Sequence, residues 1–210
     1  MIKLYHSKGT RGFRVIWLCE ELGIEYEVEK VDFSKEYRFS SEWLKINPLG
    51  KVPSLEDGQL LMSESCAMMQ YILDRYGNGR LQPISGTVEH ADFLQWLWFS
   101  EATFARPVGE IVNHLREFPG EEKNLKVIEE MRSRISKCVA ALDVALEGKS
   151  FILGSDFTAA DISLGYTLSI AQNRIPEAFP KRVANLSLIH ISEPTRLRRI
   201  SYAVVCVEKK

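Results

Sequence analysis

The sequence predicts an α/β domain followed by an all-α domain. Over residues 1–76, stretches in which apolar and polar residues alternate take turns with stretches of helical apolar spacing. A segment rich in Gly, Pro and Ser then interrupts both patterns, and beyond it only helical spacing is found. We therefore place the first domain at residues 1–78, a linker at 79–88 and a helical second domain at 89–185.

The first domain opens with a strand, a helix and a second strand. Ile2 and Leu4 begin the first strand. In the helix that follows, apolar side chains recur at i, i+3, i+4 and i+7, namely at Val15, Leu18, Cys19 and Leu22. Gly23 stands just past its end, where glycine is common. Residues 24–29, IEYEVE, alternate apolar residues with Glu, which is typical of a half-buried strand.

A short helix, a hairpin and a longer helix complete this domain. SSEWLKIN, residues 40–47, predicts the short helix, and the Asp-Gly pair at 57–58 marks a hairpin within 51–62. Ser63 is the expected N-cap of a helix that ends near Tyr76. The element order βαβαββα predicts a small layered domain with a mixed sheet.

The second domain shows helical patterns throughout. HADFLQWLWFSEATF, residues 90–104, is helical and aromatic, and Pro107 should kink or break the helix that follows. Thr158 and Asp161 resemble a capping box, with Asp in place of the usual Glu. Between Pro107 and this capping box, the sequence predicts a long amphipathic helix with apolar residues at Leu125, Ile128, Met131, Ile135, Cys138, Leu142 and Leu146.

Charge and cysteine content exclude several classes of function. The formal net charge of −1 leaves no basic surplus for nucleic acid. No apolar run approaches the roughly 20 residues that a membrane span needs, and no signal-peptide pattern opens the chain. The 4 cysteines are scattered, without a CxxC pair or a His at metal-ligand spacing. We therefore expect no metal and no dithiol redox site, in a reducing cytoplasmic compartment.

The last stretch of the chain breaks the preceding pattern. LSLIHISEPTR at 186–196 and ISYAV at 200–204 resemble the two ends of a translated sequencing adapter, with LRR in the place of a variable index. We expect residues 186–210 to be a non-native tail and leave them out of the functional reasoning. The alternative is a genuine C-terminal strand or helix.

Four stretches in order carry a resemblance to a known family. They are YHSKGTRGFRVIWLCEELGIEYE at 5–27, NPLGKVPSL at 47–55, LMSESCAMMQYIL at 61–73 and GSDFTAADISLGYTL at 154–168. The chain resembles the cytosolic glutathione transferases of the bacterial type. The resemblance implies a thioredoxin-like first domain, a helical-bundle second domain, glutathione as co-substrate, and a homodimer that acts in detoxification.

Lys51, Val52 and Pro53 have a physical interpretation of their own. Proline is confined to sheet edges and bulges, and a cis Pro53 would turn the backbone so that Val52 presents its N–H and C=O outward. A peptide-like ligand can pair there as an extra strand. The resemblance implies that the cysteinyl part of glutathione does so, with Lys51 near the glycyl carboxylate. Without it, Pro53 simply starts a strand and Lys51 is solvated.

Glu64 and Ser65 lie in the predicted first turn of a helix. Free N–H groups and the helix dipole suit an anion there, Ser65 adds a hydroxyl donor, and Glu64 can bind an ammonium group. The resemblance implies that the pair holds the γ-glutamyl end of glutathione. N-capping alone would explain the same residue types.

Thiol activation requires a hydrogen-bond donor and positive potential beside the sulfur, because the thiolate is the nucleophile. HSKGTRGFR, at the mouth of the first helix, offers both. Relatives place serine or cysteine near this point, so we predict that Thr10 donates, with Ser7 or the Gly9 N–H as alternatives. Arg11 adds positive potential or is a solvated first-turn residue. His6 is expected to be structural or a wall of the pocket.

The resemblance also implies that the second substrate lies against the helical domain. Its candidate lining residues are Trp98, Phe104, Arg106 and Tyr166, although core packing is the simpler interpretation of any one of them. Glu101 is a candidate for the γ-glutamyl amine of the neighbouring subunit's ligand.

The expected function is that of a glutathione transferase which adds the glutathione thiol to a small, partly apolar electrophile. One alternative is another glutathione-dependent enzyme, such as a thiol-disulfide reductase, dehalogenase or isomerase. The other is a non-catalytic binding module, since one fold hosts many functions. The lack of Cys near Thr10 argues against the reductase, and the intact KVP and ES motifs argue against the module.

Overall fold

The structure is a computed structural model that describes residues 1–179. Within them the chain divides between Leu81 and Gln82 into two compact units, which are described separately here. This division falls inside the linker expected at 79–88. The adapter-like stretch 186–210 lies outside the described residues.

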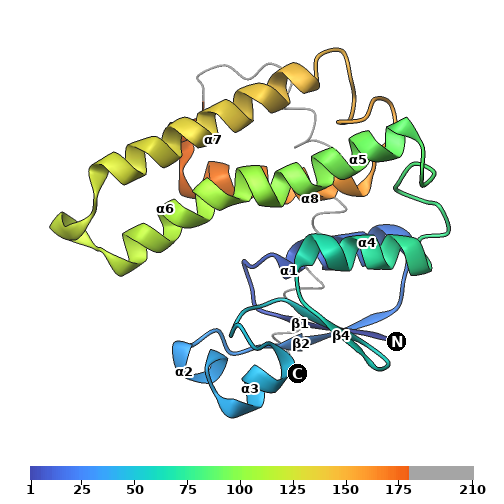
Figure 1. Cartoon of the computed structure of the whole chain (residues 1–210), viewed down its shortest axis with the longest axis horizontal. Coiled ribbons are helices and arrows are strands. Elements are labelled where there is room, and N and C mark those ends of the chain that lie inside the picture. Colours follow the sequence, from blue (N-terminus) through green and yellow to red (C-terminus); the bar gives the residue numbers. More distant parts are fainter. Residues whose placement is uncertain (180–210) are drawn as a thin grey trace. The chain divides into compact units, whose positions relative to one another are not determined.

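The first unit is built on a four-stranded mixed sheet, as predicted (Figure 1). Its strands are β1 (Ile2–His6), β2 (Tyr26–Lys30), β3 (Ser54–Asp57) and β4 (Leu60–Met62), in the order β2-β1-β3-β4. β1 pairs parallel with β2 and antiparallel with β3, and β3 pairs antiparallel with β4. β1 is therefore a central strand, and the turn that leaves its end starts from the middle of the sheet.

Helices cover both faces of this sheet. α1 (Gly12–Leu22) and α4 (Ser65–Tyr76) lie side by side on one face, with α2 (Lys35–Arg38) and α3 (Ser41–Ile46) on the other (Figure 1). Successive side chains of a strand point to opposite faces. Tyr5 therefore packs on Trp43 of α3, while His6 faces α1. The sequence pattern does not predict α2, because a four-residue helix is too short to show periodicity.

The C-terminal end of α1 agrees with the sequence prediction, whereas the N-terminal end of α4 does not. Gly23 follows α1 with a left-handed φ of 64°, as its position predicts. The prediction that Ser63 is the N-cap of α4 was wrong. Glu64 takes that place with a φ of 74°, and its side chain makes no capping hydrogen bond. A residue preference for hydroxyls at N-caps cannot reveal that the backbone turns one residue later.

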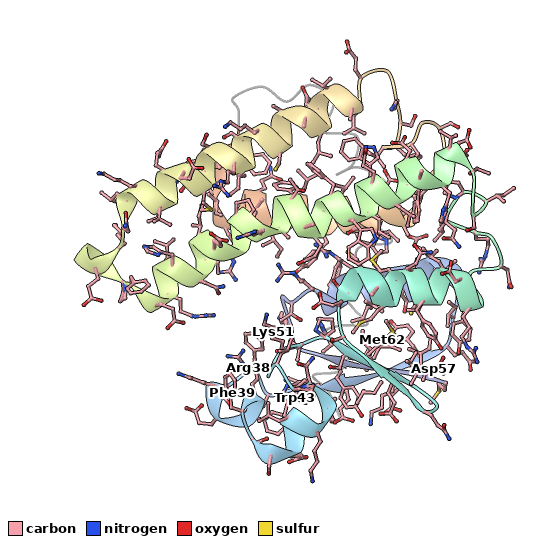
Figure 2. All side chains as sticks on the ribbon, viewed as in Figure 1. Arg38, Phe39, Trp43, Lys51, Asp57 and Met62 are labelled. Carbon is pink, nitrogen blue, oxygen red and sulfur yellow. The ribbon has the colours of Figure 1, made fainter. Side chains whose placement is uncertain are left out.

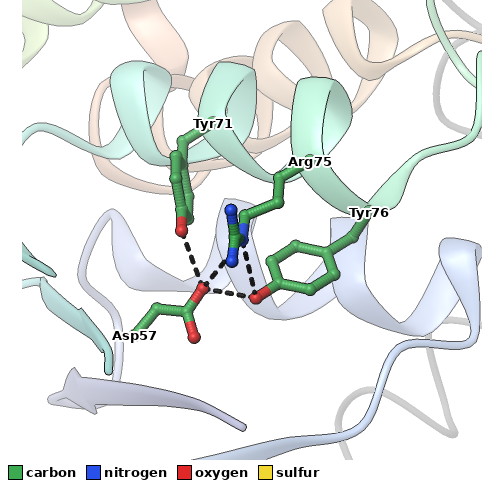
Figure 3. A network of polar contacts seen from close by, with 4 residues as sticks. All are labelled: Asp57, Tyr71, Arg75 and Tyr76. Carbon is green, nitrogen blue, oxygen red and sulfur yellow. Dashed lines mark hydrogen bonds and ion pairs between the residues drawn. The ribbon is translucent and has the colours of Figure 1, made fainter. Parts of the chain in front are cut away.

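A polar cluster fastens the β3–β4 hairpin to the C-terminal end of α4 (Figure 3). One carboxylate oxygen of Asp57 accepts hydrogen bonds from the phenol of Tyr76 and, at 2.7 Å, from that of Tyr71. Arg75 Nε lies 3.7 Å from the same oxygen. The hydrogen bond from the Tyr76 phenol, and to a smaller extent that from Tyr71, lowers the pKa of Asp57 below its usual value. The hairpin is thereby tied to the helix whose other end forms part of the candidate site.

The second unit is helical, as predicted. α5 (Val88–Trp98), the π-helical segment η1 (Phe99–Ala105) and α6 (Arg106–Glu117) form one continuous run, and α7 (Leu125–Ala145) packs along α6 (Figure 1). α8 (Ala159–Arg174) packs on α5 and η1, and η2 (Gly120–Glu122) and η3 (Pro176–Ala178) are short 3-10 turns. No helix within residues 1–179 is long and apolar enough to cross a membrane.

Pro107 does not end the helical run. It lies in the first turn of α6, and the irregularity precedes it as η1. Proline lacks the N–H that would bond the carbonyl four residues earlier, which belongs to Thr103. The Cys138 thiol donates to that carbonyl over an S···O distance of 4.0 Å. Pro107 therefore coincides with the change from π-helical to α-helical geometry and not with a break in the run.

Thr158 and Asp161 form the predicted capping box at the start of α8. Asp161 Oδ2 accepts from the N–H and the hydroxyl of Thr158, both at 2.9 Å, and its Oδ1 accepts from the Ile152 N–H at 2.8 Å. The buried carboxylate thus joins the loop before α8 to the first turn of the helix, which is a structural role.

Candidate functional site

The turn from β1 into α1 brings three residues into contact. A Cβ added to Gly12 would lie 2.5 Å from His6 Nδ1 and 3.2 Å from Pro53 Cβ. Only glycine fits such spacing at the first position of the helix. Gly12 therefore allows the N-terminus of α1 to approach both the end of β1 and the loop that carries Pro53.

His6 is a buried and neutral imidazole. Its side chain is 4% exposed, and burial lowers its pKa to about 4. Nδ1 lies 3.3 Å from Thr10 Oγ1, and Nε2 has no hydrogen-bond partner among the described residues. At pH 7 this group therefore contributes shape and one polar contact to the site, but no charge.

Thr10 lies half-buried just before α1, and its hydroxyl is already engaged. Oγ1 donates to the Ser7 carbonyl at 2.7 Å, and the Thr10 N–H donates to the same oxygen at 3.2 Å. Arg11 occupies the N-cap position of the helix. To donate to a ligand, the Thr10 hydroxyl must rotate its hydrogen away from Ser7. The side chain of Ser7 is half-buried in the same turn.

Asn47 shapes the loop that carries the KVP motif. Its buried Oδ1 accepts from two loop N–H groups, at 3.1 and 3.3 Å, and its Nδ2 donates to Ser54 Oγ at 3.0 Å. The Val52–Pro53 peptide bond is cis. Within the described part of the chain, the Val52 N–H and C=O pair with no other backbone group. The loop therefore presents one free backbone edge of the kind that pairs with an extended peptide.

Lys51 is exposed beside this edge, near two residues of the α2 region, Arg38 and Phe39 (Figure 2). Arg38 Nη1 donates to the Gly50 carbonyl at 3.4 Å. Gly50 has a φ of 61°, and a Cβ there would lie 2.7 Å from the Arg38 carbonyl oxygen. The loop thus packs closely on α2, and two cationic side chains stand at its outer end.

The N-terminus of α4 supplies the Glu64–Ser65 pair. Glu64 is exposed, whereas Ser65 is buried at the first helical position. The first helical turn contains no acidic residue, and the one carboxylate next to it is that of Glu64 at the N-cap, which makes no capping hydrogen bond. The dipole and the N–H groups at this end of α4 are of the kind that bind anions, and the assignment of Glu64 and Ser65 to a ligand stays a prediction.

Arg14 is a residue of this region that the sequence reasoning did not single out. It is fully buried, at 0% exposure, and its Nη1 donates to Ser65 Oγ at 3.2 Å and to Cys66 Sγ at 3.5 Å. A signal was present, because Arg14 is four residues before Leu18 and so lies on the apolar face of α1. Arginine is rarely buried without a specific role.

The first two turns of α1 therefore connect the candidate groups. Gly12 contacts the Pro53 loop, the preceding turn holds Thr10, and Arg14 reaches Ser65 at the start of α4. A free backbone edge, a helix N-terminus suited to an anion and a hydroxyl are thus gathered within one unit. Residues 1–179 contain no group of three or more His, Cys, Asp or Glu side chains placed to hold a metal ion.

The candidates in the second unit differ in exposure. Trp98 is 42% exposed, and Glu101 and Tyr166 are half-buried. Arg106 is exposed and pairs with Glu110 at 3.0 Å. Phe104 is fully buried and packs near Phe99 with ring centroids 6.5 Å apart. Its side chain is part of the core of this unit, which fits the simpler interpretation given above for any one of these residues. The other four candidates, Trp98, Glu101, Arg106 and Tyr166, are exposed or half-buried.

The mixed-sheet unit followed by a helical unit agrees with the architecture that the resemblance to the glutathione transferases implies. Residues 1–74 match the family model of the glutathione S-transferase N-terminal domain, and residues 126–199 match that of the C-terminal domain. The second match extends past residue 186, where the adapter-like stretch begins.

Relatives in other organisms support the same assignment. Glutathione S-transferase 1 of Schizosaccharomyces pombe is 30% identical over 166 residues, covering 75% of this chain and 70% of that protein. Glutathione S-transferase F10 of Arabidopsis thaliana is 27% identical over 169 residues, covering 78% and 77%. The chain belongs to the glutathione S-transferase family.

Solved structures show the same fold. The glutathione transferase URE2P6 of Phanerochaete chrysosporium, in complex with oxidized glutathione, is 27% identical with a TM-score of 0.82 and covers 98% of this chain and 97% of that one. A glutathione S-transferase of Actinobacillus pleuropneumoniae is 27% identical with a TM-score of 0.73, covering 94% and 90%.

Proposed function

We propose that this glutathione transferase binds glutathione along the edge at Val52 and conjugates its thiolate to a small, partly apolar electrophile. The observation that carries the proposal is that one unit holds both the free Val52 backbone and the start of α4, which is suited to an anion. The Val52 N–H and C=O pair with the cysteinyl residue. Ser65 and the N–H groups of α4 bind the γ-glutamyl carboxylate, and Glu64 binds the ammonium group. Lys51 binds near the glycyl carboxylate.

Thr10 is the proposed thiol activator. Rotation of its hydroxyl from the Ser7 carbonyl toward the ligand sulfur exchanges a neutral hydrogen bond for a charge-assisted one. The N-terminal dipole of α1 and the cation of Arg11 favour the thiolate further. The thiol proton is released to water, the sulfur forms a bond to the electrophilic carbon, and a leaving group departs with its electron pair. On an activated alkene, the neighbouring carbon takes the pair and then a proton from water.

The exposed and half-buried aromatic candidates of the second unit, Trp98 and Tyr166, are proposed to contact the electrophile, together with Arg106. Glu101 remains a candidate for the amine of the ligand in a neighbouring subunit. We place the enzyme in the cytoplasm and in detoxification. We also propose a homodimer, because the edge strand β4 exposes apolar Leu60 and Leu61. Light scattering should then give about twice the 24.0 kDa mass of the chain.

Thiol-disulfide exchange is the second candidate. The observation favouring it is the oxidized glutathione bound to the glutathione transferase URE2P6 of Phanerochaete chrysosporium, which is 27% identical to this chain. A threonine at position 10 cannot form the mixed disulfide that a cysteine would form there, so conjugation ranks first.

Ultraviolet difference absorbance on addition of glutathione at neutral pH tests the proposal, because the thiolate absorbs where the thiol does not. We expect a saturable thiolate band in the wild type and in Thr10→Ser, and a weaker band in Thr10→Ala. Loss of a charge-assisted hydrogen bond should lower the conjugation rate about 10- to 100-fold in Thr10→Ala. An unchanged band and rate would exclude Thr10 as the donor, and binding without any band would favour the disulfide chemistry.

A further inference from the structure

We infer that Arg14 is a positioning residue of the anion site at the start of α4. It holds the Ser65 hydroxyl so that its hydrogen is directed to the γ-glutamyl carboxylate, and it places a buried positive charge behind that hydroxyl. The inference rests on the proposed glutathione site and adds a residue that does not touch the ligand.

The hydrogen bond from Arg14 determines where the Ser65 hydroxyl hydrogen points. A serine hydroxyl has one hydrogen to donate and two lone pairs to accept with. Arg14 Nη1 donates to Ser65 Oγ at 3.2 Å, so one lone pair is occupied and the hydrogen is directed away from the guanidinium. Among the described residues, that hydrogen has no acceptor. The arrangement leaves Ser65 as a donor with a fixed direction.

The positive charge of Arg14 also favours an anion at Ser65. A guanidinium stays protonated at all pH values of interest, so Arg14 is a buried cation. A carboxylate bound to Ser65 would lie within about 6 Å of it, since a hydroxyl–carboxylate bond spans roughly 2.7 Å. At that separation, inside the protein, opposite charges attract appreciably, and the dipole of α4 acts with the same sign.

These two effects distinguish positioning from simple packing. Arg14 also donates to Cys66, so it joins α1 to α4 whether or not a ligand is present. If this joining were its whole role, its loss would weaken the binding of every glutathione-like peptide alike. If it orients Ser65 toward a carboxylate, its loss weakens only peptides that carry the γ-glutamyl carboxylate.

The test compares glutathione with its γ-aminobutyryl analogue, which lacks only that carboxylate. Calorimetry on the full-length protein gives the two dissociation constants. The dissociation constant of the analogue divided by that of glutathione measures recognition of the carboxylate. In Arg14→Gln we expect glutathione to bind about tenfold more weakly and the analogue to change less than about twofold. Arg75→Gln, the same substitution at the other end of α4, should leave the ratio at its wild-type value.

Circular dichroism shows whether each variant is folded. Where Arg14→Gln is not, Arg14→Lys decides, because lysine keeps the charge but loses the planar fork that reaches Ser65. We expect its ratio to fall at least about threefold. An unchanged ratio in whichever variant is folded overturns the role of Arg14 while leaving the glutathione site intact. If the wild type binds neither peptide, the glutathione site itself is refuted, and the role of Arg14 with it.

Discussion

The buried imidazole of His6 makes the stability of the first unit depend on pH in a defined way. In an unfolded chain histidine titrates near pH 6.5, whereas burial lowers the pKa of His6 in the folded protein to about 4. Between these values the unfolded chain binds a proton that the folded chain does not. The stability is therefore fully present above pH 6.5 and is lost as the pH falls toward 4.

The size of this effect follows from the two pKa values. Lowering the pH from 7 to about 4.5 should cost about 2.5 kcal/mol of the free energy of unfolding through His6 alone. Carboxylates also titrate in this range, so a variant must isolate the histidine. His6→Asn is suitable, because its amide can occupy the place of Nδ1 next to Thr10 and does not ionise.

Urea unfolding of both proteins at the two pH values provides the measurement. The wild type should lose about 2.5 kcal/mol more than His6→Asn on acidification. Nuclear magnetic resonance of labelled imidazoles adds a direct reading of the His6 pKa. Equal losses in the two proteins, or a His6 resonance that titrates near pH 6.5, would refute the reasoning.

Three further substitutions test the packing described above. Gly12→Ala should destabilise the protein by about 1–3 kcal/mol in urea unfolding and reduce glutathione affinity, since the new Cβ meets His6 Nδ1 at 2.5 Å. Asp57→Asn should lower the pKa of Tyr71, which burial and the hydrogen bond to Asp57 raise to about 12, in an ultraviolet phenolate titration. Asp161→Ala should cost on the order of 2–4 kcal/mol in thermal unfolding, because two buried N–H groups lose their acceptor.

Each of these has a control or a contradicting result. Asp156→Ala removes an exposed carboxylate near the same helix and should change stability by less than about 0.5 kcal/mol. A similar loss in Asp156→Ala and Asp161→Ala would show that the capping box is not the cause. A Gly12→Ala protein with wild-type stability would mean that His6 moves without cost. An unchanged Tyr71 titration in Asp57→Asn would show that the hydrogen bond to Asp57 does not raise the pKa of Tyr71.

Local patterns were sufficient for most of the fold. Helical spacing located α1 and α7, the Asp-Gly pair located the β3–β4 hairpin, and Gly23 located the end of α1. The four-residue α2 and the π-helical η1 escaped, because neither has a periodicity of its own. η1 depends on contacts with distant helices, such as the bond between the Ser100 hydroxyl and the Ser163 carbonyl.

The candidate site was predictable where its residues act through local backbone geometry. Pro53 and Ser65 lie at a sheet edge and at a helix start, which short motifs reveal. Asn47 and Arg14 act across the fold, through a loop and a neighbouring helix, so a linear pattern shows their identity but not their partners. The sequence locates the Thr10 hydroxyl in the turn before α1, but its bond to the Ser7 carbonyl depends on a rotamer that the sequence does not determine.

The π-helical segment η1 sets the angular phase between the helices on either side of it. A π turn accommodates one residue more than an α turn, and each residue of an α-helix turns the chain by about 100°. Deleting one residue from Phe99–Ala105 would therefore let an α turn close in place of a π turn, and Val108 and Ile111 would keep their places in the core. A one-residue deletion should therefore be tolerated better in η1 than inside α5 or α6, where it would rotate the residues that follow by about 100°.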